Sequence, residues 1–452
     1  MSHPHSIDIM NHLACLAEKN NYIAPELYQK HNVKRGLRNE NGTGVLVGLT
    51  NVSSVKGYKL EGGIKSPAEG KLFYRGIDVE DFVSGFQSQN RRGFEECAYL
   101  LLFGVLPTAE QLTQFNQLLD EHRNLPSSFT ENMILKIPSK DIMNKLQRSI
   151  LVLYSHDKNP DDTTVSNVLR QSIELISRFP TIISYGYQAK AHYFDSKSLF
   201  IHSPQAGIGT AENILYMTRP DNTYTKTEAE VLDLALVIHA EHGGGNNSAF
   251  ATHVVSSSGT DTYSSIVAAI GSLKGPKHGG ANIRVREMIQ NIKANVPHIN
   301  NRDILKDYLW KIIKKEAFNK EGLIYGMGHA VYTKSDPRTS LLKSKAFELA
   351  VEKDRVDEFN LYKNIEDLSL ELFRDLKGDS FDICANVDLY SGFVYELLNI
   401  PPELYTPLFA TARIAGWCAH RIEQLVSDQK IIRPAYANTS LAEKYIPLPS
   451  RI

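Results

Sequence analysis

The stretch FEECAYLLLFGVLP, residues 94–107, decides the fold class of this chain. It predicts a helix with an identifiable end, because Gly104 is followed shortly by Pro107. Segments with helical spacing and polar connectors continue the pattern, at 107–125, 139–156, 161–190 and 228–242. A last long helix is expected over about 403–427. The chain is therefore predicted to be mainly α.

Strand-like patterns are confined to the N-terminal part of the chain. Residues 1–35 are expected to be helical, and a glycine-rich region with short β-branched runs follows them. Three short strands are predicted there, at VLVGL (45–49), GYKLEG (57–62) and KLFYRG (71–76). From Asp78 onward the pattern is helical again. The prediction is a mainly α protein with a minor β element near the N-terminus.

Local signals place the ends and faces of several helices. Thr227 and Glu230 form a capping-box pattern that is expected to open the helix of 228–242, and Gly243 to Gly245 are expected to end it. The segment YSSIVAAIGSLKG (263–275) is rich in small residues, which predicts a helix buried against others. The charged, amphipathic stretches 300–320 and 340–377 are expected to be helices with one solvated face.

The composition excludes several classes of protein. The 452 residues are 42% hydrophobic and 22% charged, as in an ordinary globular protein, and the formal net charge of -1 argues against a nucleic-acid binder. No apolar run approaches the roughly 20 residues that cross a bilayer, so no membrane association is expected. Four scattered cysteines without a CxxC pair predict free thiols in a reducing, cytoplasmic setting.

Histidines flanked by glycines are the first candidates for chemistry. In HAEHGGGN (239–246), His239 and His242 are three residues apart and share one helical face. They could hold a metal ion, or they could bond the terminal carbonyls of their helix. In GPKHGGAN (275–282), His278 precedes Gly279 and Gly280, where the backbone can approach a ligand closely. A surface histidine on a turn would show the same pattern.

Charged residues near helix ends give a second group of candidates. The segment GLIYGMGHAVYTKSDPR (322–338) does not fit a dinucleotide GxGxxG pattern. Asp336 and Pro337 predict an N-cap and a first helical residue, which places Arg338 in the first turn. There Arg338 could bind an anion together with the helix terminus, or be a surface arginine. In NVDLYSG (386–392), Asp388 alone would be interpreted as an N-cap.

Arg413 is unusual because its surroundings in the sequence are apolar. It lies in LFATARIAGWCAH (408–420), and no acidic residue occurs between Glu403 and Glu423. Its own helix therefore offers no counter-charge. Arg413 must either pair with a distant carboxylate or bind an anionic ligand, and both interpretations stay open.

Taken together, these segments resemble the motif set of the citrate synthase family, in its order and close to its spacing. The matching segments are HAEHGGGN, GPKHGGAN, GMGHAVYTKSDPR, NVDLYSG, RIAGWCAH with the later IIRP, GKLFYRGIDVEDF and EECAYLLLFGVLP. They span roughly residues 40–435. Each motif alone is weakly specific, whereas the ordered set is highly specific.

The resemblance implies an architecture and an activity. A large helical domain would comprise residues 1–279 and 389–452, and a small domain, 280–388, would close over the active site. The enzyme would join the acyl group of acetyl-CoA to oxaloacetate and release citrate and CoA, a step of the tricarboxylic acid cycle. It would be a cytoplasmic homodimer. No metal or redox cofactor is implied, since acetyl-CoA is a substrate.

The resemblance also implies roles for single residues. Asp388 would be the base that removes a proton from the acyl methyl group, His278 would hydrogen-bond the thioester oxygen, and His329 would polarise the oxaloacetate ketone. Oxaloacetate would be held by His242, Asn246, Arg338, Arg413 and, from the neighbouring subunit, Arg433. Candidate CoA contacts are Leu323, Gly326, Gly328, Lys334, Lys343 and Arg284. The family's usual basic residue four positions after His329 is Thr333 here, although Lys334 follows.

Three other functions compete with this interpretation. A 2-methylcitrate synthase would use propionyl-CoA with the same residues, and one methylene is worth only about 1–3 kcal/mol of discrimination. A metal-dependent hydrolase or lyase could be built on His239, His242 and His253. A non-catalytic binding protein could have kept the fold, although it would not need Asp388, His278 and His329 together.

Overall fold

The computed structural model describes residues 4–62, 64–378, 382–427, 430–440 and 442–451. It consists of two compact units, Met1–Gly48 with Arg433–Ile452, and Leu49–Ile432. The first unit carries α1 (Pro4–Asn21), α2 (Pro25–Lys30) and the short 3₁₀ turns η1 (Arg35–Leu37) and η4 (Leu448–Ser450). These helices confirm the expected helical character of the N-terminal residues.

The second unit is built almost entirely of helices, and the prediction of a mainly α fold is confirmed. Its first helices are α3 (Val79–Ser88), α4 (Phe94–Phe103), α5 (Ala109–His122), the π-helical η2 (Thr130–Leu135), α6 (Ile142–Tyr154), α7 (Val165–Asp195), α8 (Thr210–Thr218) and α9 (Lys226–His239). They are followed by α10 (Asn247–Ser256), α11 (Thr262–Lys274), α12 (Ala281–Asn295), α13 (Arg302–Ile313), α14 (Pro337–Glu352), α15 (Val356–Lys377), α16 (Asp388–Leu397), the 3₁₀ turn η3 (Pro402–Leu404) and α17 (Tyr405–Ser427).

The minor β element is an antiparallel sheet near the N-terminus, in the order β1-β2-β3. It comprises β1 (Ser53–Glu61), β2 (Ile64–Tyr74) and the two-residue β3 (Ile77–Asp78). The strands predicted around 57–62 and 71–76 are confirmed, whereas the one predicted at 45–49 is wrong, since that stretch is irregular. Leu46 and Leu49 there are 84% and 90% exposed, so their side chains do not belong to the core that the described residues form.

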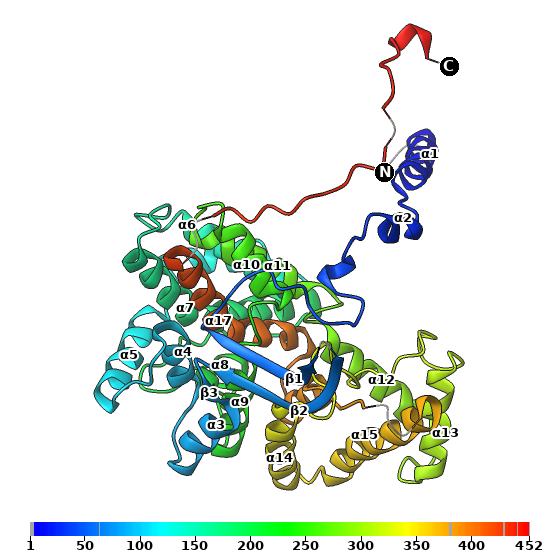
Figure 1. Cartoon of the computed structure of the whole chain (residues 1–452). Helices are drawn as coiled ribbons and strands as arrows, with labels where there is room; N and C mark the ends of the chain where they lie inside the picture. The colour runs from blue at the N-terminus through cyan, green and yellow to red at the C-terminus, as the bar shows by residue number, and fades with distance from the viewer. Residues whose placement is uncertain (1–3, 63, 379–381, 428–429, 441, 452) are drawn as a thin grey trace. The chain divides into compact units, whose positions relative to one another are not determined.

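Helix α17 forms the centre of the core. Nineteen of the twenty positions from Tyr405 to Gln424 are buried, all but Ile422, and the helix packs against α4, α7, α9, α10 and α11 (Figure 1). The long helix α7 is buried in the same way over most of its length. A helix that is buried on nearly all sides is surrounded by other helices, so α17 lies at the centre of the packing of this unit. Its residue Arg413 is thereby carried into the interior, where it is 1% exposed.

The helix ends follow the expected local chemistry at α4 and α14 but not at α9, which ends at His239 with Ala240 as its C-cap, before Gly243 to Gly245 that were predicted to end it. Gly104 ends α4 in the left-handed conformation (φ 78°), and Asp336 with Pro337 opens α14, as predicted. The capping box of α9 is formed by Thr225 and Glu228, so the box predicted two residues later is wrong. The earlier box prevails because the carboxylate of Glu228 is also held by Arg219 at 2.7 Å.

Helices α12 to α15 lie together on one side of this unit (Figure 1). They make up most of the predicted small domain, 280–388, which stays a prediction. The hairpin β1–β2 packs on the loop that leads into α14. A side chain at Gly57 or Gly70 would overlap the carbonyl oxygens of Val331 and Ser335, so the glycines permit this close approach. The hairpin thus fixes a loop that carries predicted site residues.

Candidate active site

His242, in the loop after α9, lies beside His329, a predicted histidine from a distant segment. His242 is buried, and its Nε2 lies 3.3 Å from the hydroxyl of Tyr332. The rings of His242 and His329 meet edge to face with centroids 5.1 Å apart. Tyr332 also packs against His329 at 4.6 Å. Sequence reasoning missed Tyr332, because nothing in its local sequence distinguishes it from a core tyrosine.

The segment 326–328 sets the position of His329. Gly326 and Gly328 have φ values of 88° and 86°, which only glycine adopts readily, and Met327 forms an antiparallel bridge with Ala385. The amide of Gly328 donates to the carbonyl of Cys384 at 2.7 Å. This bridge joins the segment that carries His329 to the segment that leads into α16.

Hydrogen bonds fix the tautomer of His329. Its Nδ1 accepts from the backbone amides of Val331 at 3.0 Å and Tyr332 at 3.1 Å. An Nδ1 that accepts two N–H groups carries no proton, so the proton of the neutral ring lies on Nε2. His329 is therefore equipped to donate a hydrogen bond from Nε2.

Asp388 is the first residue of α16, and the expectation that it caps the helix is wrong. The N-cap position is occupied by Val387, and the described residues provide no capping hydrogen bond there. Burial raises the pKa of the Asp388 carboxyl to about 6, and nearby Asp336 adds to the rise. A carboxyl group whose pKa lies close to neutrality is suited to take up and release a proton.

His278 is held by two residues at the start of α10. Its Nε2 lies 3.1 Å from Asn246 Oδ1 and 3.2 Å from Ser248 Oγ. The Ser248 hydroxyl also accepts from Trp417 Nε1 at 3.0 Å. Burial lowers the pKa of His278 to about 4, and Arg413 adds to the effect, so the ring is neutral at physiological pH. Sequence reasoning missed Ser248 and Trp417.

The two predicted arginines differ in their partners. Arg338 forms a bidentate pair with Asp336, from Nε at 3.0 Å and from Nη2 at 2.7 Å. Arg413 donates from Nε to the carbonyl of His239 at 2.7 Å, but its buried Nη1 and Nη2 have no hydrogen-bond partner among the described residues. Of the two interpretations of Arg413, the structure thus favours an anionic ligand over a pair with a carboxylate.

The electrostatic environment links these residues into one cluster. Burial lowers the pKa of His242 well below its ordinary value, and the neighbouring charges of Arg338 and Arg413 lower it further. The pKa of Asp388 responds to Arg338 and Arg413 as well. His239 lies beside the cluster, 99% buried, with its ring against Phe409 at 4.5 Å. The sequence-predicted residues of four distant segments thus share one environment.

The residues predicted to bind CoA are placed less uniformly. Gly326 and Gly328 adjoin His329, Leu323 is 53% exposed, and Lys334 is exposed. Two of the predicted cations are engaged elsewhere. Lys343 pairs with Glu366 at 2.6 Å, and Arg284 pairs with Glu287 at 3.0 Å. Arg433 belongs to the other compact unit, and its part in the site stays a prediction.

The metal site considered from the sequence is not supported. Among the described residues, the one group whose ligand-type atoms all lie within 4.8 Å of each other is His253, His420 and Glu423. That group does not contain His239 or His242. The described residues therefore do not join the three histidines on which a metal-dependent hydrolase was considered.

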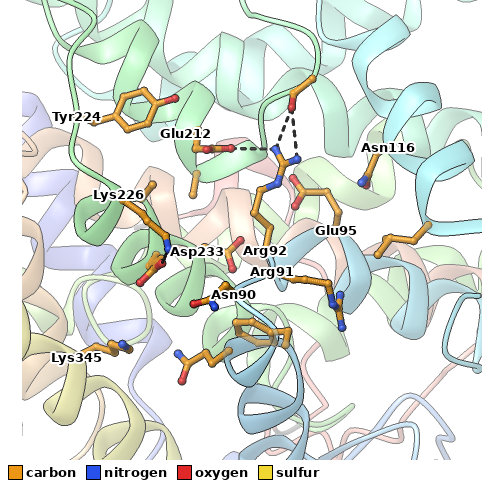
Figure 2. Close-up of a pocket in the computed structure, with 17 residues that line it drawn as sticks. Asn90, Arg91, Arg92, Glu95, Asn116, Glu212, Tyr224, Lys226, Asp233 and Lys345 are labelled. Atoms are coloured by element: carbon orange, nitrogen blue, oxygen red, sulfur yellow. Dashed lines mark hydrogen bonds and ion pairs between the residues drawn. The ribbon is translucent and has the colours of Figure 1, made fainter. Parts of the chain in front are cut away.

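A separate cavity of about 690 Å³ lies at the other end of α9 (Figure 2). Within it, Arg92 pairs with Glu212 at 2.9 Å and bonds the carbonyl of Gly207. Asp233 accepts from the backbone amide of Gly93 at 2.7 Å and so caps α4. None of the residues that line this cavity is a predicted site residue. The cluster around Arg413 is therefore the stronger candidate for chemistry.

No helix in the described part of the chain is long and apolar enough to cross a membrane.

Comparisons with known proteins agree with the motif set. The family model described as "Citrate synthase, C-terminal domain" matches residues 40–435. A citrate synthase of Deinococcus radiodurans is 33% identical over 387 residues, covering 85% of this chain and 94% of that protein. A 2-methylcitrate synthase of Shewanella oneidensis is 32% identical over 384 residues, covering 84% of this chain and 92% of that protein.

Solved structures give the same result for the fold. Citrate synthase from Thermoplasma acidophilum, in a ternary complex with carboxymethyl coenzyme A and oxaloacetate, aligns with a TM-score of 0.74 at 26% identity and covers 93% of this chain and 99% of that one. Citrate synthase from Pyrobaculum aerophilum aligns with a TM-score of 0.72 at 28% identity, covering 90% and 94%. With a family match over most of its length and relatives above 30% identity, this chain belongs to the citrate synthase family.

Proposed function

We propose that this enzyme condenses acetyl-CoA with oxaloacetate and hydrolyses the resulting thioester to citrate and CoA. The observation that carries the proposal is the open guanidinium of Arg413, buried beside neutral histidines and beside a carboxyl group with a pKa near 6. An uncompensated buried cation calls for an anionic ligand. Oxaloacetate has two carboxylates, which match the fork of an arginine.

In this mechanism Asp388 starts the reaction. Its carboxylate would take a proton from the acyl methyl group, and His278 would donate a hydrogen bond to the thioester oxygen as negative charge develops there. One such donor typically contributes about 2.7–4 kcal/mol. The carbon of the resulting enolate would then attack the oxaloacetate ketone. His329 would donate a hydrogen bond from Nε2 to the ketone oxygen and pass its proton to the new hydroxyl group, and the proton that Asp388 took from the methyl group would balance the one that His329 loses.

The contacts of His278 impose one requirement on this role. Ser248 donates to Asn246 Oδ1 at 2.8 Å, so that Oδ1 accepts, and His278 Nε2 then carries the ring proton towards it. For Nδ1 of His278 to donate instead, Nε2 must carry no proton and must accept a hydrogen bond. The Ser248 hydroxyl, 3.2 Å away, can provide it by turning its O–H from Asn246 to His278. Ser248 would thus control whether the Nδ1 of His278, which would face the thioester, carries the ring proton.

Closure of the predicted small domain would complete the site. His329 and Arg338 belong to the segment 280–388, whereas His242, His278 and Arg413 lie outside it. Drawing the two groups together around oxaloacetate would exclude water until the carbon–carbon bond has formed. The chain has two tryptophans, Trp310 in α13 and Trp417 in α17, one on each side of the proposed boundary. A fluorescence change of each on oxaloacetate binding, in single-tryptophan variants, would test closure.

The acyl preference decides between the main proposal and its alternative. The relatives include both citrate synthases and 2-methylcitrate synthases, and the proposed residues would serve either reaction. We expect acetyl-CoA to give the higher kcat/KM when thiol release is compared for acetyl-CoA and propionyl-CoA with oxaloacetate. A higher value for propionyl-CoA would identify a 2-methylcitrate synthase.

Activity of single variants tests the assignment of the base. Asp388→Asn should abolish thiol release while oxaloacetate still binds, because the amide cannot accept the methyl proton. The matched control is Asp382→Asn, an exposed carboxyl six positions earlier in the chain. Absence of thiol release by the wild-type enzyme with both acyl-CoAs would instead support a non-catalytic protein.

Assembly and location complete the proposal. We propose a homodimer in which Arg433 reaches oxaloacetate of the neighbouring subunit, and a cytoplasmic setting in which all four cysteines remain free thiols. Light scattering would measure the assembly. Mixing an Arg433→Ala chain with an Asp388→Asn chain would recover activity in hybrids only if the arginine acts across the interface.

A further inference from the structure

Glu241 is the acidic residue whose charge acts most strongly on the pKa of Arg413, yet the two side chains do not form an ion pair. Glu241 and Arg413 are each at most 1% exposed, and each influences the pKa of the other. No ion pair within 4.0 Å joins them among the described residues, and Glu241 Oε2 and the Nη atoms of Arg413 are all buried without partners. Opposite charges in a low-dielectric interior normally pair, so something holds Glu241 back.

Two hydrogen bonds and one glycine hold the Glu241 carboxylate. Its Oε1 accepts from Ser53 Oγ at 2.9 Å and lies 3.0 Å from His420 Nε2. Its Oε2 occupies space that Gly416 leaves open, since a Cβ there would overlap this oxygen. The hairpin β1–β2 and helix α17 thus clamp Glu241 from two directions.

The partners of His420 determine its charge. His253 Nδ1 lies 2.9 Å from Gln424 Oε1, which can only accept, so this Nδ1 carries the proton of His253. His253 Nε2 is then an acceptor, and His420 Nδ1, 3.1 Å away, must donate to it. Since His420 Nε2 donates to Glu241, both nitrogens of His420 carry protons.

Other groups around His420 agree with an imidazolium. Glu423 Oε2 lies 3.7 Å from His420 Nδ1, so a second carboxylate faces the ring. Despite burial, which acts in the opposite direction, the two glutamates raise the pKa of His420 to about 9. The same imidazolium helps to lower the pKa of Glu241 to about 2. Glu241 and His420 therefore form a buried ion pair directly behind the proposed oxaloacetate site.

We infer that His420 is a positioning residue, which binds Glu241 and thereby keeps the guanidinium of Arg413 open for a carboxylate of oxaloacetate. The inference rests on the proposed function. Without the imidazolium, Glu241 would remain a buried anion whose nearest unsatisfied cation is Arg413. The two would pair, and oxaloacetate would have to displace an internal carboxylate. His420 thus acts on substrate affinity without touching the substrate.

A double-mutant cycle tests this inference by direct binding. The variants are His420→Gln, Glu241→Gln and the pair combined, and the probe is oxaloacetate alone, measured by calorimetry. We expect His420→Gln to weaken binding by at least about tenfold, because a free Glu241 competes for Arg413. Adding Glu241→Gln should restore binding to within about threefold of wild type, because the competing charge is gone. A simple packing defect at His420 would not be repaired by the second change.

Kinetics and structure give independent readouts. In His420→Gln the KM for oxaloacetate should rise while the KM for acetyl-CoA stays close to that of wild type. A crystal structure of this variant without ligand should contain an ion pair between Glu241 and Arg413. Unchanged oxaloacetate binding in His420→Gln, or a double variant no better than that single one, would overturn the inference.

Two further outcomes are distinguishable. If His420→Gln does not fold, Glu241→Gln alone decides, since it should bind oxaloacetate within about threefold of wild type, and a tenfold loss would refute the role of the pair. If the wild-type enzyme itself binds no oxaloacetate, the proposed function fails, and the inference fails with it.

Discussion

The pH dependence of catalysis should report on Asp388. With a pKa of about 6, its carboxyl group must lose its proton before it can act as a base. At saturating oxaloacetate, kcat/KM for acetyl-CoA should be half-maximal near pH 6 and should fall about tenfold for each further pH unit below it. Arg413→Gln should move this midpoint upward, because Arg413 favours the ionised form.

The same pKa shift predicts an effect on stability. A rise from 3.8 to about 6 is about two units, and each unit is worth about 1.36 kcal/mol. The folded state binds this proton more tightly than the unfolded state, so the stability that protonation contributes is complete below pH 3.8 and is lost as the pH rises through 6. Asp388→Asn cannot ionise, and should be more stable than wild type at neutral pH by up to about 3 kcal/mol.

Urea unfolding and thiol release, each followed from about pH 4 to about pH 8, measure both effects. Asp382→Asn, with its exposed carboxyl, is the control and should match wild type in each assay. The stability difference for Asp388→Asn should vanish towards pH 4. Two results would refute this reasoning: an amide variant that is less stable than wild type at neutral pH, or an acid limb of activity near pH 4. Either would mean that burial does not disfavour the ionised form of Asp388 as proposed.

Three further substitutions test the supporting structure. Ser248→Ala should lower kcat about tenfold to a hundredfold with little change in the KM for oxaloacetate, because His278 loses the hydroxyl that sets its tautomer. Steady-state kinetics measure both constants, and an unchanged kcat would contradict this role. Arg413→Lys should raise the KM for oxaloacetate by about thirtyfold, since a charge-assisted hydrogen bond of about 2 kcal/mol is lost, and calorimetry gives the matching Kd. Gly70→Ala should lower the free energy of unfolding by about 1–3 kcal/mol in urea titrations, whereas Gly85→Ala, in an open part of α3, should not lower it.

Local sequence signals were sufficient for most of the helices and for some of their ends. Gly104 with Pro107 and Asp336 with Pro337 act within one turn of chain, so the backbone must follow them. The same locality explains an error. Both Thr225 with Glu228 and Thr227 with Glu230 fit a capping box, and the choice between them depends on tertiary partners of Glu228.

Contacts between distant segments could not be predicted from single motifs. The bonds of Trp417 to Ser248 and of His420 to Glu241 join residues 169 and 179 positions apart. Each of these residues, considered alone, is of a type that occurs commonly at a core or helix position. The ion pair of Lys343 with Glu366 could not be predicted either, because a lysine on an amphipathic helix is expected to be solvated. Only the resemblance to a family ordered the predicted site residues in advance.

The contrast between the two arginines explains why the sequence around Arg413 contains no acid. Arg338 is neutralised by Asp336, which orients it rigidly, whereas Arg413 keeps an unpaired charge at a cost that only a ligand can offset. An acidic residue one helical turn away on α17 would pair with Arg413 permanently and close the site. The acid that tertiary packing does bring near, Glu241, is occupied by His420. The absence of a local counter-charge and the presence of a distant histidine therefore serve the same end, an arginine that is buried, fixed and still available.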